Sequence, residues 1–392
     1  MQILFVNHTG FVSGAERSLL DLLAGLPAQV RAEVACPPGP LADAVSALET
    51  PVTPLPEVSG SLELHPRHTP ETVLRLARAG FIAGWRSRRL RVDVLHANTI
   101  RAGLASAFAR PLAAGSIVVH VRDCLPDSAA ANLTRRVVTR TAKLLVANSA
   151  YTARSFVGSN GAVPTRVVFS PVDLRTFDPG RVDLARARAG LGLAEGTAAI
   201  GVVAQLTPWK GQDTAVRAVA ALAARGWDVR LFLVGEAKFV SRATRFDNHA
   251  YVRGLRTLVD ELRAGDRVEF LGERDDVPEI MRALDVVLVP SWEEPFGRTV
   301  VEAMAMGTPV IATSVGGPAE VVEEGRNGLL AHPRRPEEWI EALEALLSRR
   351  ELRQRLGQEG RRTAAGMGRE AHASAMLAVW QEAMGLRSNI CR

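Results

Sequence analysis

The sequence has little cysteine, almost no lysine and no long apolar segment. Its three cysteines, Cys36, Cys124 and Cys391, are far apart, form no CxxC pair and have no histidine at metal-ligand spacing. This pattern excludes a disulfide-stabilised scaffold and a structural zinc site. No uninterrupted apolar run approaches the roughly 20 residues of a membrane-spanning helix. The opening run, MQILFVNHTG, has no basic leader, so we expect no signal peptide and a cytoplasmic protein.

Lysine is scarce because arginine replaces it. Of the 48 basic residues only Lys143, Lys210 and Lys238 are lysines, and 42 acidic residues leave a formal net charge of +6. The arginine excess is typical of a GC-rich bacterial genome. The net charge is mild for this length, fits an anionic small molecule or a membrane surface as partner, and does not indicate a nucleic acid.

What the chain does contain is a regular alternation of elements. Apolar residues make up 47% and charged residues 23% of a chain whose 392 residues predict two domains. Short apolar runs alternate with helical patterns, which is typical of parallel sheets covered by helices on both faces. The predicted strands are Ile3–Val6, Val92–His96, Ser116–Val121, Leu144–Asn148, Val167–Phe169, Ala198–Ala204, Val229–Val234, Val268–Leu271, Val286–Pro290 and Pro309–Ala312.

Proline and glycine interrupt both periodicities at Pro171–Val182, which places the join between two doubly wound, Rossmann-like α/β domains there. We expect an N-terminal domain over residues 1–175 and a C-terminal domain over residues 176–370. The final helical pattern, over residues 371–392, is expected to pack back on the first domain. Open parallel sheets bind ligands at the carboxyl ends of their strands, so two such sheets facing each other would enclose a cleft.

The segment Pro290–Glu302, PSWEEPFGRTVVE, carries the densest set of chemical groups. A strand ends at its first residue and a helix begins at Gly297, where bare amides and the positive end of the helix dipole can hold phosphate or sugar oxygens. Glu294 could accept a hydrogen bond from a sugar hydroxyl, and Glu302 could accept hydrogen bonds from a diol elsewhere on the ligand. Solvated surface charge is the commonplace alternative, but it does not explain Glu302, which stands among apolar residues. A glycine turn at Ser314–Glu320, SVGGPAE, would add further amides.

The stretch from Glu293 to Leu330, EEPFGRTVVEAMAMGTPVIATSVGGPAEVVEEGRNGLL, resembles the signature of the GT4-type retaining glycosyltransferases of the GT-B fold. Their E-x7-E motif matches Glu294 and Glu302 in spacing and surroundings. The resemblance also covers VVAQLTPWKGQDTAVRA and VEFLGERDDVPEIMRALDVVLVPS and is looser towards the N-terminus. It implies two Rossmann-like domains that face each other across a cleft and bind a nucleoside diphosphate sugar.

The resemblance implies a role for each matching residue. Glu302 would bind the ribose hydroxyls of the donor, and Glu294 would contact the hydroxyls of its sugar. Backbone amides would hold the sugar and its diphosphate, and the end of one strand would cradle the base. The residues concerned are Phe296, Gly297, Arg298 and Thr299 for the sugar and diphosphate, and Leu271, Gly272 and Arg274 for the base.

The donor diphosphate also needs a cation. The family has a Gly-Arg pair shortly before a Lys-Gly pair, and the matching stretch here is Gln205–Gly211, QLTPWKG. Lys210 matches the family lysine, whereas Gln205 stands where the arginine is expected and brings no charge. A lysine at this position, in a chain that otherwise uses arginine, favours a phosphate-binding role over an ordinary exposed charge. Whether Arg298 replaces the missing charge is left open.

The N-terminal domain would provide the opposite wall. The loop His8–Glu16, HTGFVSGAE, resembles the family's GG-x-E loop with Ser13 in place of the first glycine, and Gly14 would let the backbone approach the diphosphate. His120 and Arg122 alternate at the end of the strand SIVVHV and so share one face. One of them is expected to face the donor sugar, as the family's strand-end histidine does. A satisfied core histidine is the alternative.

The function that this resemblance implies is a glycosyl transfer. No DxD motif is present, so we expect an enzyme without metal or cofactor, in which Lys210 and helix dipoles stabilise the leaving diphosphate. Glu294, His120 and Lys210 are the expected catalytic residues. His96 and Asn98, which end a neighbouring strand, would line the acceptor side.

The expected reaction is retaining transfer of a hexosyl or N-acetylhexosaminyl group from a UDP-sugar to an acceptor hydroxyl, in natural-product glycosylation. Alternatives are a cell-envelope polysaccharide or glycolipid glycosyltransferase, a GT-B sugar-nucleotide epimerase or phosphorylase, and a non-enzymatic sugar-nucleotide-binding protein. Donor base, sugar, linkage, acceptor and oligomeric state do not follow from the sequence.

One basic segment is a candidate contact with a membrane surface. Thr72–Leu90, TVLRLARAGFIAGWRSRRL, places five arginines among leucine, phenylalanine and tryptophan. It could rest weakly on an anionic membrane surface. A helix that covers the sheet with a solvated basic face has the same pattern and is commoner.

Overall fold

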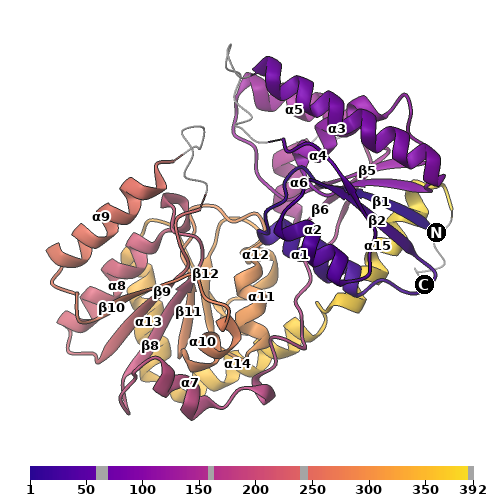
Figure 1. Cartoon of the computed structure of the whole chain (residues 1–392). Helices are drawn as coiled ribbons and strands as arrows, with labels where there is room; N and C mark the ends of the chain where they lie inside the picture. Colours follow the sequence, from indigo (N-terminus) through magenta and orange to yellow (C-terminus); the bar gives the residue numbers. More distant parts are fainter. Residues whose placement is uncertain (59–68, 158–162, 239–245, 387–392) are drawn as a thin grey trace. The chain divides into compact units, whose positions relative to one another are not determined.

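The computed structural model describes residues 1–58, 69–157, 163–238 and 246–386, and it separates into two compact units (Figure 1). Unit 1 comprises Met1–Pro171 and Arg369–Arg392, and unit 2 comprises Val172–Gly368. The chain therefore leaves unit 1 once and returns to it with its last helix. Within the described ranges no helix is long and apolar enough to cross a membrane.

The described strands of unit 1 form a seven-stranded parallel sheet in the order β3-β2-β1-β4-β5-β6-β7. Their bounds are β1 Gln2–Val6, β2 Arg31–Cys36, β3 Val52–Pro54, β4 Val94–Ala97, β5 Ser116–Val121, β6 Leu144–Ala147 and β7 Thr165–Val167. The described helices are α1 Gly14–Ala24, α2 Pro40–Ala47, α3 Thr69–Leu90, α4 Ile100–Ala109, α5 Ala129–Thr141, α6 Ala150–Val157 and α15 Arg369–Ala383.

Helices cover both faces of this sheet, because its central strands carry buried apolar side chains on both sides. On one face, α1, α2 and α15 enclose a core that includes Leu22, Leu41 and Trp380. On the other, α3 to α6 enclose a core that includes Ala83 and Val138. The last helix is thus part of the first core, although it follows unit 2 in the chain.

The sequence prediction omits β2 and β3 and places β7 two residues too late, at Val167–Phe169. β2 lacks a continuous apolar run because it contains Glu33, which is buried. Arg86 of α3 donates to both carboxylate oxygens of Glu33, at 2.6 and 2.9 Å, and Thr53 Oγ1 donates to one of them at 2.5 Å. A buried carboxylate that is paired in this way is tolerated inside a strand, but it hides the strand from a periodicity argument.

The described strands of unit 2 form a six-stranded parallel sheet in the order β10-β9-β8-β11-β12-β13. Their bounds are β8 Ala198–Val203, β9 Val229–Val234, β10 Val268–Gly272, β11 Val286–Val289, β12 Val310–Thr313 and β13 Leu329–Ala331. The described helices are η1 Pro179–Arg181, α7 Leu184–Gly190, η2 Pro208–Lys210, α8 Gln212–Ala224, α9 Asn248–Glu261, α10 Val277–Ala283, α11 Arg298–Ala305, α12 Pro318–Val321, α13 Pro336–Ser348 and α14 Arg350–Ala365.

The sheet of unit 2 is also covered on both faces. α8, α9 and α13 enclose a core with Val219, Leu258 and Trp339, while α10 and α11 contact β8, β11 and β12. The predicted strands of the second half are all present within a residue or two, and β13 adds a short strand that the sequence prediction omits.

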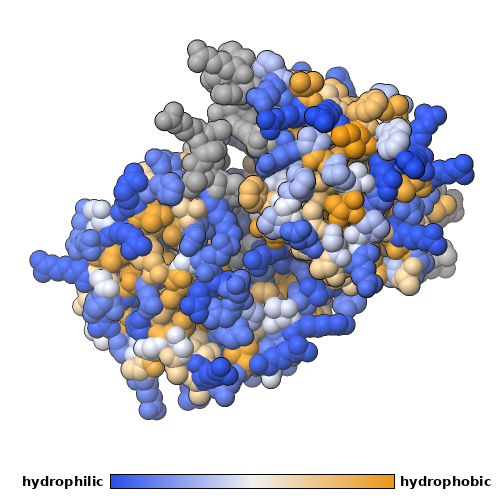
Figure 2. All heavy atoms as spheres, in the orientation of Figure 1, coloured by the Kyte–Doolittle hydropathy of each residue, from blue (hydrophilic) through white to orange (hydrophobic). Residues whose placement is uncertain are grey.

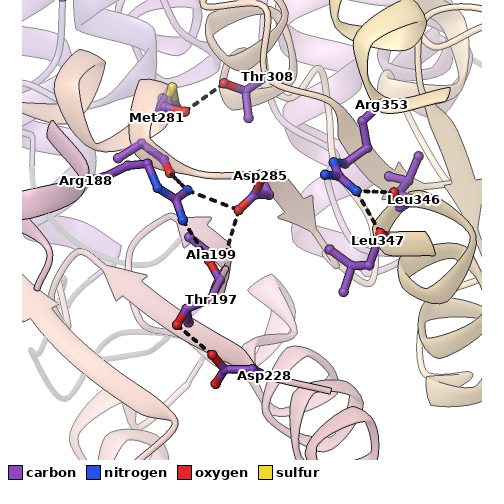
Figure 3. Close-up of polar contacts among 11 residues, drawn as sticks. Arg188, Thr197, Ala199, Asp228, Met281, Asp285, Thr308, Leu346, Leu347 and Arg353 are labelled. Atoms are coloured by element: carbon purple, nitrogen blue, oxygen red, sulfur yellow. Dashed lines mark hydrogen bonds and ion pairs between the residues drawn. The ribbon is translucent and has the colours of Figure 1, made fainter. Parts of the chain in front are cut away.

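A polar cluster fixes the amino-terminal edge of this sheet. Arg188 of α7 points towards Asp285, which precedes β11 (Figure 3). Arg188 Nη1 donates to Asp285 Oδ2 at 3.2 Å, and Nη2 donates to the Thr197 carbonyl at 2.7 Å. The same carboxylate oxygen accepts from the Ala199 amide at 2.9 Å. Asp285 therefore ties α7 to β8 and β11 at this edge, and the loops at the opposite, carboxyl edge carry the candidate site.

Candidate functional site

Each sheet has one point at which its strand order reverses, called here the switch point. In unit 2, β8 lies beside β11, although β9 and β10 come between them in the chain. In unit 1, β1 lies beside β4 in the same way. Open parallel sheets bind ligands beyond the carboxyl ends of the strands at such a reversal. The loops that follow β8 and β11, and those that follow β1 and β4, are therefore where a site is expected.

At the switch point of unit 2, Lys210 and Glu294 form an ion pair. Lys210 Nζ lies 2.5 Å from Glu294 Oε2, and Ser291 Oγ donates to the same oxygen at 2.9 Å. Glu294 is only 7% exposed. The ammonium also lies 4.1 Å from the centre of the Trp209 ring, where the face of an aromatic ring attracts a cation. Two residues that lie 84 positions apart in the chain, and that the sequence predicts as catalytic, thus touch each other.

Glycine lets the two loops approach closely enough to form this pair. Gly211 has a φ of +69°, and a Cβ there would lie 2.0 Å from the Pro290 carbonyl oxygen, which no side chain allows. The Trp292 amide donates to the Trp209 carbonyl at 2.8 Å. The loops after β8 and β11 are therefore joined through their backbones on both sides of the ion pair.

The glycine turn after β12 holds the backbone of Glu294. The Glu294 amide donates to the Val315 carbonyl at 3.3 Å, and the Gly317 amide donates to the Glu294 carbonyl at 2.8 Å. A Cβ on Gly316 would lie 2.0 Å from that same carbonyl oxygen. The Gly317 amide is thus already used within the protein, so this turn positions Glu294, which the sequence does not reveal.

The helix after Glu294 brings the second glutamate of the motif to the same edge. Gly297 precedes α11 with a φ of +85°, and Thr299 Oγ1 donates to the carbonyl of Val203 at the end of β8, at 3.1 Å. Glu302 is 9% exposed and lies 3.3 Å from an Arg298 guanidinium nitrogen. Arg298, the candidate replacement for the missing family arginine, is therefore engaged by Glu302.

The other donor-side residues predicted in unit 2 are less closely grouped. Gln205 follows β8, and its carbonyl accepts from Gln212 Nε2 at 2.9 Å. Leu271 and Gly272 end β10, which is separated from β8 by β9. Phe296 is buried beside Gly317, a placement that suits support of the loop.

Arg274, the remaining residue of the predicted base edge, is exposed and forms a two-fold ion pair with Asp276 at 2.7 and 2.6 Å. Asp276 is the N-cap residue of α10, but its carboxylate accepts from Arg274 and makes no side-chain cap bond. The pairing holds the pKa of Asp276 below its usual value, through the Arg274 hydrogen bonds first.

At the switch point of unit 1 the glycine loop begins a well-capped helix. Gly14 is the first residue of α1, and Ser13 is its N-cap. The Ser13 amide donates to Glu16 Oε2 at 3.1 Å, and Asn7 Nδ2 donates to Glu16 Oε1 at 3.2 Å. Ser13, which stands where the family's loop has its first glycine, therefore forms a capping box with Glu16.

His120 and Arg122 lie together at the end of β5, and both are buried. Arg122 Nη2 contacts His120 Nδ1 at 3.2 Å and donates to Asn98 Oδ1 at 3.1 Å, while Arg122 Nε donates to the Asn98 carbonyl at 3.2 Å. Burial first, and then the Arg122 charge, holds the pKa of His120 well below its usual value. His120 is therefore neutral and accepts from the guanidinium, and its role towards a donor sugar stays a prediction.

His96 lies behind this pair. Its ring packs edge-on against that of His120, with centroids 5.6 Å apart, and Trp380 Nε1 of α15 donates to His96 Nδ1 at 3.2 Å. Burial lowers the pKa of His96 to about 3, with Arg122 and His372 as further causes. The sequence predicts His96 on the acceptor side of the site, but the structure buries it completely in the core of unit 1.

Three residues of the two switch points are absent from the sequence prediction. Trp209 and Ser291 lie in the two loops that follow β8 and β11, where Trp209 contacts Lys210 and Ser291 contacts Glu294. His8 lies at the start of the loop after β1, where Thr99 Oγ1 lies 3.0 Å from its Nδ1. Burial, followed by the Arg101 charge, lowers the pKa of His8 to about 3. Within the described ranges, no three His, Cys, Asp or Glu side chains gather as a metal ion would require.

Comparison with known proteins decides the family. Residues 185–363 match the family described as glycosyl transferases group 1, and residues 13–173 match the glycosyl transferase 4-like domain. The D-inositol 3-phosphate glycosyltransferase of Corynebacterium aurimucosum is 32% identical over 291 residues, which are 72% of this chain and 67% of that protein. The chain belongs to the group 1 glycosyltransferase family. The predicted family resemblance is therefore confirmed.

Two further relatives define how far the similarity extends. The D-inositol 3-phosphate glycosyltransferase of Nocardia farcinica is 34% identical over 308 residues, 77% of this chain, and the match spans 64% of that protein. The structure of HepE from Anabaena in complex with UDP-glucose is 27% identical, with a TM-score of 0.81 over 97% of this chain and 100% of that chain. Together with the two parallel-sheet units, this similarity confirms the predicted GT-B fold.

Proposed function

We propose that this family member is a retaining, metal-independent glycosyltransferase that moves a hexosyl or N-acetylhexosaminyl group from a UDP-sugar to an acceptor hydroxyl. The observation that carries the proposal is the Lys210–Glu294 ion pair at the switch point of unit 2. Lys210 could bind a diphosphate and Glu294 could bind sugar hydroxyls. Both lie beyond the carboxyl ends of the strands, where open parallel sheets bind their ligands.

In this proposal the donor replaces the ion pair. Lys210 would neutralise the diphosphate that leaves, with the amides at the start of α11 beside it. Glu294 would accept hydrogen bonds from the hydroxyls of the sugar, and Glu302 from those of the ribose. The bond between the sugar carbon and the diphosphate breaks, a bond to the acceptor oxygen forms, and the departing phosphate takes the acceptor proton.

Different observations support the proposed donor and the proposed acceptor. UDP is favoured because HepE, which is 27% identical, was crystallised with UDP-glucose. For the acceptor we propose a small hydroxyl compound of natural-product type. The curated relatives, named for D-inositol 3-phosphate, make a phosphorylated polyol the second acceptor to test.

The first experiment is a thermal-shift panel of UDP-, GDP- and TDP-sugars. A donor at about 100 times its Kd adds roughly 2.7 kcal/mol to the free energy of unfolding, and we expect this only for UDP-sugars. Glu302→Ala should remove the shift, whereas Arg267→Ala, at the opposite edge of the same sheet, should keep it. A shift with GDP- or TDP-sugars alone would refute the UDP assignment.

The second experiment adds acceptors to the donor that binds. Formation of a glycosylated natural product or inositol phosphate with retained anomeric configuration supports the proposal. Turnover of donor alone would identify an epimerase, and a requirement for orthophosphate would identify a phosphorylase. Donor binding without product from any acceptor, including glycans and glycolipids, would indicate a binding protein.

A further inference from the structure

Helices α3, α4 and α5 form the layer that covers one face of the sheet in unit 1. α3 packs directly against the backbone of α4 at Gly80 and Gly84. A Cβ on Gly80 would lie 2.1 Å from the Ala105 carbonyl oxygen, and one on Gly84 would lie 2.7 Å from that of Ala109. The outward side of the layer is therefore a continuous surface, on which Phe108 of α4 adjoins α3.

This surface exposes large apolar side chains. Leu74, Phe81 and Trp85 of α3 are 69%, 60% and 50% exposed, and they follow one another along one stripe of the helix. Six of the twelve exposed large apolar side chains among the described residues lie on these three helices. Figure 2 shows orange and blue spheres interleaved along the part of unit 1 where α3 runs. Singly exposed apolar residues are ordinary, but a cluster of this kind marks an interaction surface.

The same surface is strongly basic. Within the bounds of α3, α4 and α5 the sequence has nine arginines and a single acidic residue, Glu71. Glu71 is paired with Arg75 at 2.6 Å, and Arg86 is turned inward to Glu33. Three further exposed arginines share α3 with the apolar stripe, two more are exposed on α5, and Arg89 of α3 lies 5.4 Å from the centre of the Trp85 ring. These exposed residues are Arg78, Arg88, Arg89, Arg136 and Arg140.

The charge of the whole chain is concentrated in the same unit. Unit 1 contains 21 basic and 13 acidic residues, a net of +8, whereas unit 2 contains 27 basic and 29 acidic residues, a net of −2. The net charge of +6 is therefore a property of unit 1, and α3 to α5 supply its most one-sided part.

We propose that the outward surface of α3, α4 and α5 binds the surface of an anionic membrane, with Phe81 and Trp85 entering the interface and the arginines contacting lipid phosphates. Interfacial helices combine these two kinds of side chain. A second copy of the chain is a poorer occupant, because a two-fold contact through this surface would oppose like charges. A nucleic acid would engage the arginines but leave Leu74 and Phe81 in water. This proposal does not depend on the proposed function.

The test is co-sedimentation of the full chain with vesicles of phosphatidylcholine, with and without phosphatidylglycerol. We expect binding at least about tenfold stronger to the anionic vesicles, weakening as salt is added. The variant Arg78→Gln/Arg88→Gln/Arg89→Gln should lose at least about tenfold of that binding. Phe81→Ser/Trp85→Ser should weaken binding even at low salt, because it removes the apolar contact.

The matched control removes three exposed arginines from unit 2. Arg186→Gln/Arg217→Gln/Arg253→Gln changes the net charge equally and should bind the vesicles as the unchanged chain does. Equal binding to neutral and anionic vesicles, or equal losses in the two triple variants, would overturn the proposal. Dimerisation or duplex-DNA binding that depends on the α3 arginines while vesicles are ignored would overturn it in favour of that other partner.

Discussion

At the switch point of unit 2 a lysine and a glutamate form an ion pair, while the corresponding place in unit 1 holds buried histidines, an arginine and a glutamate that are hydrogen-bonded to neighbouring side chains. Lys210 and Glu294 are charges that a ligand can separate, because each can exchange its partner for a phosphate or a hydroxyl. In unit 1, Asn98 accepts from Arg122, and Glu16 is used by the cap of α1. The same sheet topology thus presents an exchangeable ion pair in one unit and a buried network of side chains bonded to one another in the other.

The two units also differ in net charge. Unit 1 is strongly basic, mainly on its outer helices, whereas unit 2 is nearly neutral and its candidate catalytic charges are the Lys210–Glu294 pair. A fold-level likeness between the units therefore predicts neither where chemistry occurs nor where partners bind. Each of the following predictions breaks a feature of one unit and compares the result with a matched change in the same unit or in the other.

The largest effect is expected for the ion pair. Lys210→Ala should lower kcat about 100-fold or more, a loss of at least ~2.7 kcal/mol of transition-state stabilisation, because the leaving diphosphate loses its cation. Glu294→Ala should cost about as much, and the double variant little more, since the two residues act as a unit. Initial rates with the donor from the thermal-shift panel measure this. Arg267→Ala is the control, because it breaks the ion pair with Asp228 at the amino-terminal edge. Near-normal turnover of either single variant would remove these residues from the site.

The second prediction is that mild acid lowers the free energy of unfolding of unit 1. Burial lowers the pKa of His96 and of His8 to about 3 and that of His120 in the same direction, while the unfolded chain titrates near pH 6.5. Folding therefore favours the neutral rings. Their contribution is complete above about pH 6.5 and is lost towards lower pH, at roughly 1.4 kcal/mol per histidine per pH unit.

Urea unfolding between about pH 7 and about pH 5 measures this loss, with the unit 2 transition identified by its shift with UDP. The unit 1 transition should fall steeply, and His120→Gln should flatten its slope. His249 and His332 of unit 2 are exposed, so its transition should move much less. Parallel shifts of both transitions would contradict the assignment of acid sensitivity to unit 1.

The third prediction separates backbone conformation from close packing at the unit 2 switch point. Gly211 and Gly226 have φ values of +69° and +87°, but an added Cβ meets the Pro290 carbonyl oxygen at 2.0 Å in the first and nothing within 4 Å in the second. Gly226→Ala should cost about 1 kcal/mol of unfolding free energy. Gly211→Ala should cost at least ~2 kcal/mol more, because the two loops must separate. Equal costs would mean that the loops do not depend on this contact.

The comparison also shows which features a sequence can predict. The apolar strands and the E-x7-E spacing are local patterns, so the two parallel-sheet units and the family follow from them. β2 does not, because its buried Glu33 is stabilised by Arg86, 53 residues away. An apolar run is visible in the sequence, whereas a long-range ion pair that replaces one is not.

The candidate site divides in the same way. Lys210 and Glu294 are predicted one by one from a motif, but their contact depends on two loops that meet only in the folded sheet. Arg298 and Glu302 are four residues apart on α11. The sequence does not show that their side chains turn towards each other, and so it does not show that Glu302 binds Arg298. The glycine turn at Gly316–Gly317 predicts an anion site and proves to hold the backbone of Glu294.

The smallest expected effect compares a single hydrogen bond in the two units. Trp380→Phe keeps a large ring in unit 1 but removes the donor to His96 Nδ1, and Trp339→Phe removes the donor to the His332 carbonyl in unit 2. Both tryptophans are fully buried. His96 is buried as well, so its unpaired nitrogen should cost ~1–2 kcal/mol. His332 is an exposed residue directly after β13, where water can replace the lost donor, so Trp339→Phe should cost less than about 1 kcal/mol. Urea unfolding of the two variants measures the difference, and a larger loss for Trp339→Phe would contradict the inference that His96 is closed off from water.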